Sequence, residues 1–262
     1  MKHQAKKRFG QNFLTDQSII TSLVDAIHPQ EGETLIEIGP GLGALTKPLL
    51  SNVTELHVVE IDRDIVSWMN VEYKMPSYEK NNLIIHNVDA LKFDFSSIGR
   101  KLRITGNLPY NISTPILFHL LTNLPSIQDM HFMLQKEVVE RMVAQPSTPA
   151  YGRLSVMLQY YLQMEYLITV PPEAFSPAPK VESAFVRCVP HAELALVAKD
   201  TDLFSKIVRA AFSQRRKTIR NTLKPFLHDD DFTKLNIDTK RRAETFSVAE
   251  FVVITNYLYS LV

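Results

Sequence analysis

The feature that most constrains the fold is a glycine-rich turn between an expected strand and an expected helix. Residues 34–38 read Thr-Leu-Ile-Glu-Ile, which is typical of a buried strand, and residues 42–50 have the apolar spacing of a helix. Between them, Gly39, Gly41 and Gly43 are spaced G-x-G-x-G. Glycine lets the backbone turn sharply and approach a ligand closely. The turn is therefore a candidate ligand site.

Short apolar segments and helical segments alternate along the next hundred residues. The pattern predicts strands and helices in turn, with strands at 56–60, 83–86, 102–105 and 130–134 and helices at 65–71, 114–121 and 138–142. Alternation of this kind predicts an α/β fold, with a mostly parallel sheet covered by helices on both faces.

A change of pattern near residue 190 predicts a domain boundary. A helix at 154–161 and a last strand at 181–189 precede it, and only helices are expected after it, at 203–212, 218–226 and 248–258. We therefore expect a large α/β domain over residues 1–190 and a small all-helical domain over residues 191–262.

Composition narrows the class of protein. The chain is 45% hydrophobic and 22% charged, as is usual for a globular protein, and no apolar segment approaches the ~18 residues of a membrane span. The basic N-terminus leads into no apolar signal segment, and the single cysteine, Cys188, excludes an intramolecular disulfide. We expect a cytoplasmic monomer with no membrane partner.

The eight histidines show no metal-ligand spacing and there is no cysteine cluster, so no metal site is expected. His119 and His131 lie in apolar segments, where a hydrogen-bonded core histidine is the favoured interpretation.

Acidic residues follow the second and third expected strands, at the strand ends where open α/β sheets bind ligands. Glu60 comes 19 residues after Gly41 and can accept hydrogen bonds from a ribose diol. Asp89 can accept one from an adenine amine. Since the glycine spacing differs from the G-x-G-x-x-G of dinucleotide sites, S-adenosylmethionine is favoured over NAD, and a NAD dehydrogenase is the weaker alternative. Asp62 and Asp64 are interpreted as helix N-terminal charges.

A candidate catalytic segment, Gly106-Asn-Leu-Pro-Tyr-Asn111, follows the fourth expected strand. The adenine amino nitrogen is a poor nucleophile because its lone pair is delocalised into the ring. The side-chain oxygen of Asn107 and the carbonyl of Leu108, restrained by Pro109, can accept hydrogen bonds from its two N–H groups and so localise that lone pair. Tyr110 can stack on the base. A sulfonium cofactor supplies the electrophile, so catalysis would rest on positioning and electrostatics. The alternative is an Asn-x-Pro turn without a ligand.

Basic residues gather in one C-terminal segment, although the formal net charge of the chain is only +1. Leu203–His228 carries seven basic residues and no acidic one, including Arg215, Arg216, Lys217 and Arg220. On a helix, Arg216 and Arg220 would share a face, with no acid nearby. We predict that these residues contact RNA phosphates and that binding weakens as salt rises. The alternative is a solvated charged face. The run Lys6-Lys7-Arg8 is a weaker candidate of the same kind.

Four motifs together resemble the ribosomal RNA adenine dimethyltransferases, and most of all their bacterial small-subunit (kasugamycin-sensitivity) group. They are Gln11-Asn-Phe-Leu14, Glu37-Ile-Gly-Pro-Gly-Leu42, Asn107-Leu-Pro-Tyr110 and Gln214-Arg-Arg-Lys-Thr-Ile-Arg-Asn221. The segments His131–Glu137 and Ala174–Lys180 strengthen the likeness, which extends from Lys7 to Tyr257.

The resemblance implies a methyltransferase-type Rossmann domain followed by a small helical domain. It implies that Asn12 and Leu14 help to close a cofactor pocket with Gly39, Glu60, Asp89 and Asn107. It also implies that Phe175 stacks on the target adenine opposite Tyr110. From the residues alone, a Phe between proline-rich turns is more often a loop anchor packed on the core.

The substrate that the resemblance implies is a pair of adjacent adenosines near the 3′ end of small-subunit (16S) ribosomal RNA, dimethylated on N6 within an assembling small subunit. Two alternatives stay open: an RNA-binding assembly factor whose methylation is incidental, and an adenine methyltransferase that acts on large-subunit RNA or DNA.

Overall fold

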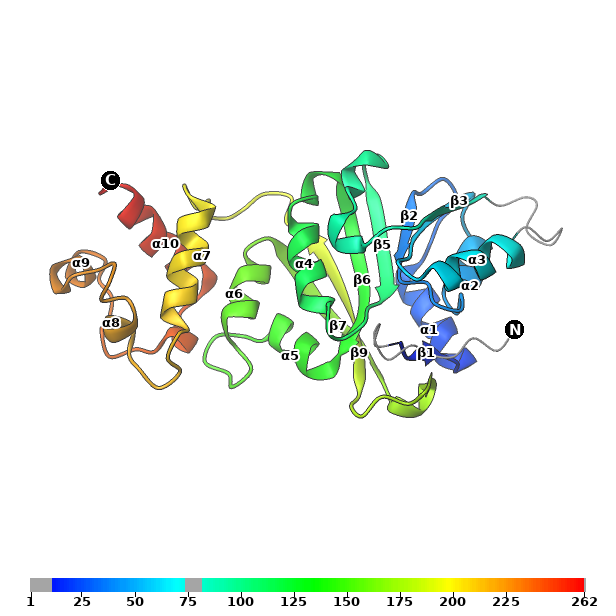
Figure 1. The fold of residues 1–262 in the computed structure, drawn as a ribbon. Helices are drawn as coiled ribbons and strands as arrows, with labels where there is room; N and C mark the ends of the chain where they lie inside the picture. The colour runs from blue at the N-terminus through cyan, green and yellow to red at the C-terminus, as the bar shows by residue number, and fades with distance from the viewer. Residues whose placement is uncertain (1–10, 74–81, 262) are drawn as a thin grey trace. The chain divides into compact units, whose positions relative to one another are not determined.

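The largest sheet of the protein has seven strands (Figure 1). The computed structural model describes residues 11–73 and 82–261. The basic run Lys6–Arg8 lies outside these residues. The strands are β2 (Leu35–Ile38), β3 (Glu55–Val59), β4 (Asn82–His86), β5 (Leu102–Asn107), β6 (Ile127–Gln135), β7 (Leu162–Val170) and β9 (Ser183–Pro190).

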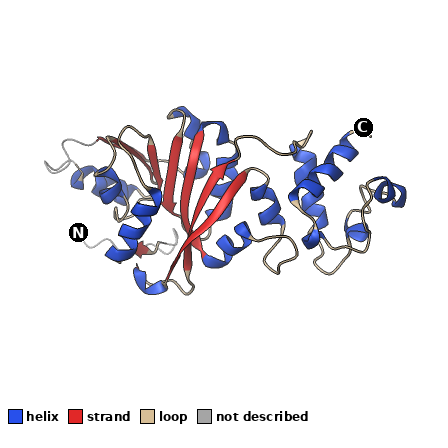
Figure 2. Cartoon of the chain, turned by 180° about the vertical axis from the view of Figure 1, so that it is seen from behind, coloured by secondary structure: helices blue, strands red, loops and turns tan. Residues whose placement is uncertain are grey.

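These strands lie in the order β4-β3-β2-β5-β6-β9-β7, with helices on either side of the sheet (Figure 2). The strands β4, β3, β2, β5 and β6 are parallel to one another, and β9 is antiparallel to β6. The predicted α/β fold with a mostly parallel sheet is therefore confirmed. All four residues of β2 are buried, because the sheet is covered on both faces.

The register places the carboxyl ends of neighbouring strands level with one another. Ile38 pairs with Val59, and Val59 pairs with His86. In the sheet, β2 lies between β3 and β5. The chain continues from β2 to β3 and β4 on one side and returns to β5 on the other side, so the strand order reverses at β2. Open α/β sheets bind ligands beyond the carboxyl ends of the strands at such a point.

The helices of this region are α1 (Gln17–Ile27), α2 (Thr46–Leu50), α3 (Arg63–Glu72), α4 (Ser113–Leu121), α5 (Lys136–Val143) and α6 (Arg153–Gln159). The last four lie within two residues of the predicted bounds at either end. Asp16 caps α1, since its carboxylate accepts the N–H groups of Ser18 and Ile19 at 2.9 and 3.1 Å. Asp62 caps α3 in the same way, which agrees with its interpretation as a helix N-terminal charge. The remaining short elements are the 3₁₀ turns η3 (Ala90–Lys92), η4 (Phe95–Ser97), η5 (Leu124–Ser126) and η6 (Pro172–Ala174).

Two features of this region differ from the prediction. The helix expected from residue 42 begins only at Thr46, because the preceding glycines adopt positive φ angles that no helix contains. The strand β7 was not predicted, and neither was the two-stranded antiparallel sheet of β1 (Phe13–Leu14) and β8 (Phe175–Ser176). Strands of two residues are too short to show any periodicity.

The chain divides into two compact units. The first unit runs to Val139 and includes Glu165–Pro190, whereas the second unit comprises Glu140–Met164 and the chain from His191 onward. Glu140–Met164, which we expected in the first domain, thus groups with the C-terminal residues. Between residues 191 and 261 the structure contains helices, turns and one isolated bridge from Thr218 to Arg242, and its helical elements are α7 (Thr201–Ala211), α8 (Ile219–Thr222), α9 (Asp229–Lys234), η7 (Ala243–Thr245) and α10 (Val248–Tyr259).

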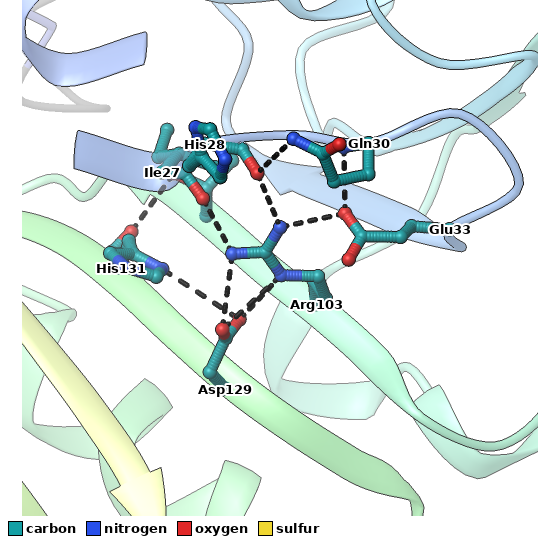
Figure 3. Close-up of polar contacts among 8 residues, drawn as sticks. Ile27, His28, Gln30, Glu33, Arg103, Asp129 and His131 are labelled. Carbon is teal, nitrogen blue, oxygen red and sulfur yellow. Dashed lines mark hydrogen bonds and ion pairs between the residues drawn. The ribbon is translucent and has the colours of Figure 1, made fainter. Parts of the chain in front are cut away.

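A buried ionic cluster ties the start of β5 to the end of α1 (Figure 3). Arg103 donates to both carboxylate oxygens of Asp129 at 3.0 and 3.1 Å, and to Glu33 at 2.7 Å. It also donates to the carbonyl groups of Ile27 and His28, which the end of the helix leaves without helical partners. Arg103 is the second residue of β5, at the opposite end of the strand from Asn107, so this cluster is structural.

Of the two histidines that we expected in the core, His119 has the expected hydrogen bond and His131 does not. His119 Nε2 lies 2.8 Å from the carbonyl oxygen of Phe93. His131 is buried beside Asp129, at 3.8 Å, and its Nε2 has no hydrogen-bond partner among the described residues. The expectation of a fully hydrogen-bonded His131 was therefore wrong. Burial lowers the pKa of His131 to about 4, so the ring is neutral at pH 7.

Candidate active site

A cavity of about 230 Å³ lies in the first unit, beyond the carboxyl ends of β2, β3, β4 and β5. It has the position that the reversal of strand order predicts. The structure brings together most of the predicted site residues in its walls, namely Asn12, Gly39, Gly41, Glu60, Asp89, Asn107, Leu108, Pro109 and Tyr110.

The glycine turn forms one wall through its backbone. Gly39 (φ 66°) donates its N–H to the carbonyl of Val59 at 2.9 Å, and Gly41 has a φ of 55°. Both angles lie in the left-handed region that favours glycine. A Cβ atom on Gly41 would also lie 3.0 Å from the ring of Phe13. Because Gly39 and Gly41 have no side chains, the turn contributes only backbone atoms to this part of the cavity wall.

Two buried carboxylates lie under this turn. Glu60 lines the cavity, and its Oε1 accepts the N–H of Asp62 at 2.7 Å. Burial raises the pKa of Glu60. Glu37, which does not line the cavity, accepts a hydrogen bond from the hydroxyl of Thr46, and burial raises its pKa to about 7. Glu60 is thus held in one orientation at the cavity wall.

Asp89 lies in the wall just after β4. Its Oδ1 accepts the N–H of Leu91 at 3.0 Å and caps η3. Apolar neighbours flank the two acids in the cavity lining, among them Ile61, Val88 and Leu91. We did not identify these apolar residues from the sequence, although each lies within two positions of a predicted acid. The acids and their neighbours together form a wall that suits a nucleoside.

The side-chain amide of Asn107 is fixed by the N-terminal segment of the described chain. Its Nδ2 donates to the backbone carbonyl of Asn12 at 3.1 Å. A carbonyl oxygen can only accept, so the amide nitrogen faces Asn12 and Oδ1 is directed to the other side. Leu108 is fixed as well, because its N–H donates to the carbonyl of Met133 on β6 at 3.1 Å. Two acceptors, Asn107 Oδ1 and the Leu108 carbonyl, are thus carried on a rigid backbone.

Gly106 permits close approach of β5 to β2 directly before this segment. A Cβ atom on Gly106 would lie 3.2 Å from the carbonyl carbon of Ile38, and closer still to its oxygen. Glycine is required at position 106 because β5 packs closely against β2 there. We did not predict this requirement, since it depends on a contact between two strands.

Tyr110 lines the cavity, and its hydroxyl is held by a hydrogen bond. The hydroxyl lies 2.7 Å from Ser183 Oγ at the start of β9. Burial raises the pKa of Tyr110, so the phenol keeps its proton. We did not predict a role for Ser183, which we assigned only to a strand.

Leu14 and Phe175 are not in the wall of this cavity. Leu14 is 5% exposed and Phe175 is 4% exposed, and they pair with each other across β1 and β8 within the hydrophobic core. The side chain of Phe175 is packed in the core, as the loop-anchor interpretation expects. The stacking role that the resemblance implies for Phe175 stays a prediction.

The basic residues of the second unit are exposed, but they do not form the predicted helical face. Residues 212–217 form turns, and α8 begins only at Ile219, so the i, i+4 relation of Arg216 and Arg220 was wrong. Arg220 forms a two-point ion pair with Asp229 at 2.6 and 2.7 Å. The expectation of no acid nearby was therefore wrong too, because the partner lies nine residues further on. Arg215 donates to the carbonyl of Pro149 at 3.1 Å.

No group of three or more His, Cys, Asp or Glu side chains among the described residues could hold a metal ion. No helix within residues 11–73 and 82–261 is long and apolar enough to cross a membrane.

Comparison with known proteins shows the family of this chain. A family model described as "Ribosomal RNA adenine dimethylase" matches residues 2–260. The chain belongs to this ribosomal RNA adenine dimethylase family. Among its curated relatives are proteins named "Ribosomal RNA small subunit methyltransferase A" from Methylobacillus flagellatus, 66% identical over 98% of this chain and 99% of the relative, and from Thiobacillus denitrificans, 57% identical over 98% of both.

A solved structure shows the fold of the family independently. The dimethyladenosine transferase from Plasmodium falciparum superposes with a TM-score of 0.82, covers 95% of this chain and 98% of its own, and is 24% identical. The methyltransferase-type Rossmann fold expected for this adenine dimethylase family member is thereby confirmed.

Proposed function

We propose that this protein transfers methyl groups from S-adenosylmethionine to the N6 amino groups of two adjacent adenosines near the 3′ end of small-subunit ribosomal RNA, within an assembling small subunit. The observation that carries the proposal is the shared cavity. The glycine turn, Glu60 and Asp89 line the same space as Asn107 and Tyr110. A nucleoside cofactor and an amine acceptor could meet there.

The walls of the cavity fit S-adenosylmethionine. The backbone of Gly39 and Gly41 leaves room for close approach, and the fixed carboxylate of Glu60 can accept hydrogen bonds from a ribose diol. Asp89, flanked by apolar side chains, can accept one from an adenine amine. When bound, the cofactor would supply an electrophilic methyl group.

The chain's own contribution to the reaction is to hold the target amine. Asn107 Oδ1 and the carbonyl of Leu108 accept hydrogen bonds from the two N–H groups of the N6 amine, which localises the nitrogen lone pair. The carbonyl of Asn12 keeps the amide of Asn107 in the required orientation. Positioned acceptors of this kind act without reorganisation during the reaction. The proton on N6 becomes acidic once the methyl group has been transferred, so no strong base is needed.

We further propose that Arg215, Arg216 and Lys217 of the second unit contact RNA phosphates. All three side chains are exposed. Arg220 joins them only if a phosphate replaces Asp229 in its ion pair, since both guanidinium contacts are used. Relatives named as small-subunit ribosomal RNA methyltransferases support this choice of substrate.

The test is methyl transfer by an Asn107→Ala variant. Loss of one positioned polar group should lower kcat by about 100- to 1,000-fold, while calorimetry shows that the cofactor still binds. Asn70→Ala is the matched control, because Asn70 is exposed on α3, does not line the cavity, and donates its side-chain amide to the Val66 carbonyl of the same helix. Wild-type turnover by Asn107→Ala would refute the catalytic assignment. Preference for large-subunit RNA or DNA in parallel assays would refute the substrate.

A further inference from the structure

The hydrogen bond between Tyr110 and Ser183 joins the edge of the cavity to the interior of the sheet. The two hydroxyl oxygens lie 2.7 Å apart, and Ser183 is 0% exposed. Ser183 does not line the cavity, whereas Tyr110 does. Tyr110 therefore belongs to the cavity wall, while its hydroxyl is anchored to a residue outside that wall.

Ser183 is itself firmly held. It is the first residue of β9 and pairs with Gln135, the last residue of β6. The next residue of the chain after Gln135, Lys136, donates its N–H to the carbonyl of Glu182 at 3.0 Å and pairs with the carboxylate of Glu182 at 2.8 Å. The backbone on both sides of Ser183 is thus restrained, and its hydroxyl is a fixed point for a neighbouring side chain.

Anchoring at the hydroxyl decides where a tyrosine ring lies. The oxygen lies on the long axis of the ring, so fixing it fixes the direction of that axis, and the in-plane preference of the phenol hydrogen restrains the ring plane. If Ser183 lost its hydroxyl, the half-buried phenol would lack a partner there and would turn toward water. A base that stacks on Tyr110 would then meet a displaced ring.

We propose that Ser183 is a positioning residue for the proposed methyl transfer, whose hydroxyl holds the Tyr110 ring in the plane on which the target adenine stacks. This inference rests on the proposed function. Ser183 contacts neither base nor cofactor and acts only through Tyr110. Its effect should therefore appear in the placement of the base and in kcat, and not in cofactor affinity.

The experiment is a double-mutant cycle with Ser183→Ala, Tyr110→Phe and the double variant. Each single variant should lower kcat by about 10- to 100-fold through misplacement of the base, with unchanged cofactor affinity by calorimetry. The double variant should lose no more than either single one. A 2-aminopurine at the target position should be quenched by stacking in the wild-type complex and less quenched in every variant.

Two controls match the chemical changes away from the cavity, in the second unit. Ser155 is also 0% exposed and donates its hydroxyl to the carbonyl of Arg141, so Ser155→Ala measures the loss of a buried serine hydroxyl. Tyr151 donates its hydroxyl to the carbonyl of Phe246 at 2.9 Å, so Tyr151→Phe measures the loss of a buried phenol hydroxyl. Both controls should keep wild-type kcat and quenching.

Equal further losses from Ser183→Ala in the Tyr110 and Tyr110→Phe backgrounds would overturn the proposal, because Ser183 would then act without the tyrosine hydroxyl. If Ser183→Ala does not fold, Tyr110→Phe alone decides, since wild-type kcat and quenching in that variant would also overturn it. Absence of adenine methylation by the wild-type protein is a separate outcome, which would refute the proposed function and with it the role of Ser183.

Discussion

Replacing Gly106 with alanine should displace the proposed adenine-binding segment, Asn107–Tyr110, without changing any of its side chains. The added Cβ would lie 3.2 Å from the carbonyl carbon of Ile38, with the oxygen nearer, and 3.3 Å from Leu108 Cδ2. Carbon and oxygen atoms approach to roughly 3.3 Å at closest, and the contact of the Cβ with the Ile38 oxygen is the shortest of the three, so β5 and β2 must separate by about 1 Å near Asn107. A displacement of that size can cost about 100-fold in rate, and the overpacking should cost about 1–3 kcal/mol of stability.

The assay is single-turnover methyl transfer at saturating cofactor, paired with urea unfolding. Gly152→Ala is the control, because Gly152 has an extended backbone (φ −167°) and no atom within 4 Å of an added Cβ. It should keep wild-type turnover. Wild-type turnover by a folded Gly106→Ala protein would refute the reasoning, since the clash would then be absorbed without moving Asn107.

Three further predictions concern stability and RNA binding. Arg103→Met leaves the buried carboxylate of Asp129 unpaired and should lower the free energy of unfolding by about 3–5 kcal/mol; the double variant with Asp129→Leu should recover much of that loss in urea titrations, and no recovery would contradict the pairing. Burial lowers the pKa of His131 to about 4, with Arg103 and Arg187 also lowering it and Asp129 raising it. An unfolded histidine takes up its proton near pH 6.5, so stability should fall as the pH drops from about 6.5 to 4, by up to about 3 kcal/mol. His131→Asn should flatten that pH dependence, and an unchanged slope would refute the role of His131. Alanine at Arg215, Arg216 and Lys217 should reduce the slope of log affinity for RNA against log salt by about 2 to 3, measured by filter binding; an unchanged slope would exclude phosphate contacts there.

The cavity was predictable because four of the five parallel strands carry a cavity-lining residue at or just after the carboxyl end. Gly39 follows β2, Glu60 follows β3, Asp89 comes just after β4 and Asn107 ends β5. These are local signals, readable from a strand pattern and the residue after it. The sheet then brings them together without any need to know the side-chain packing.

Contacts between distant segments could not be predicted in this way. Ser183 meets Tyr110 because β9 pairs with β6, and nothing at position 183 signals that contact. Phe175 is buried because β8 pairs with β1, a ladder of only two residues. Arg220 pairs with Asp229 because the chain between them turns back. The acid-free segment that we considered, Leu203–His228, ends one residue before Asp229, so the sequence analysis did not include this acid.

The most direct test of the central claim is mass-spectrometric mapping of methylated adenines in ribosomal RNA from cells with and without this protein. We expect two adjacent N6,N6-dimethyladenosines near the 3′ end of small-subunit RNA in cells with the wild-type protein. Both should be unmethylated in cells that lack it, and in cells that carry only the Asn107→Ala variant. Undiminished dimethylation of these adenosines in cells without the protein would contradict the account.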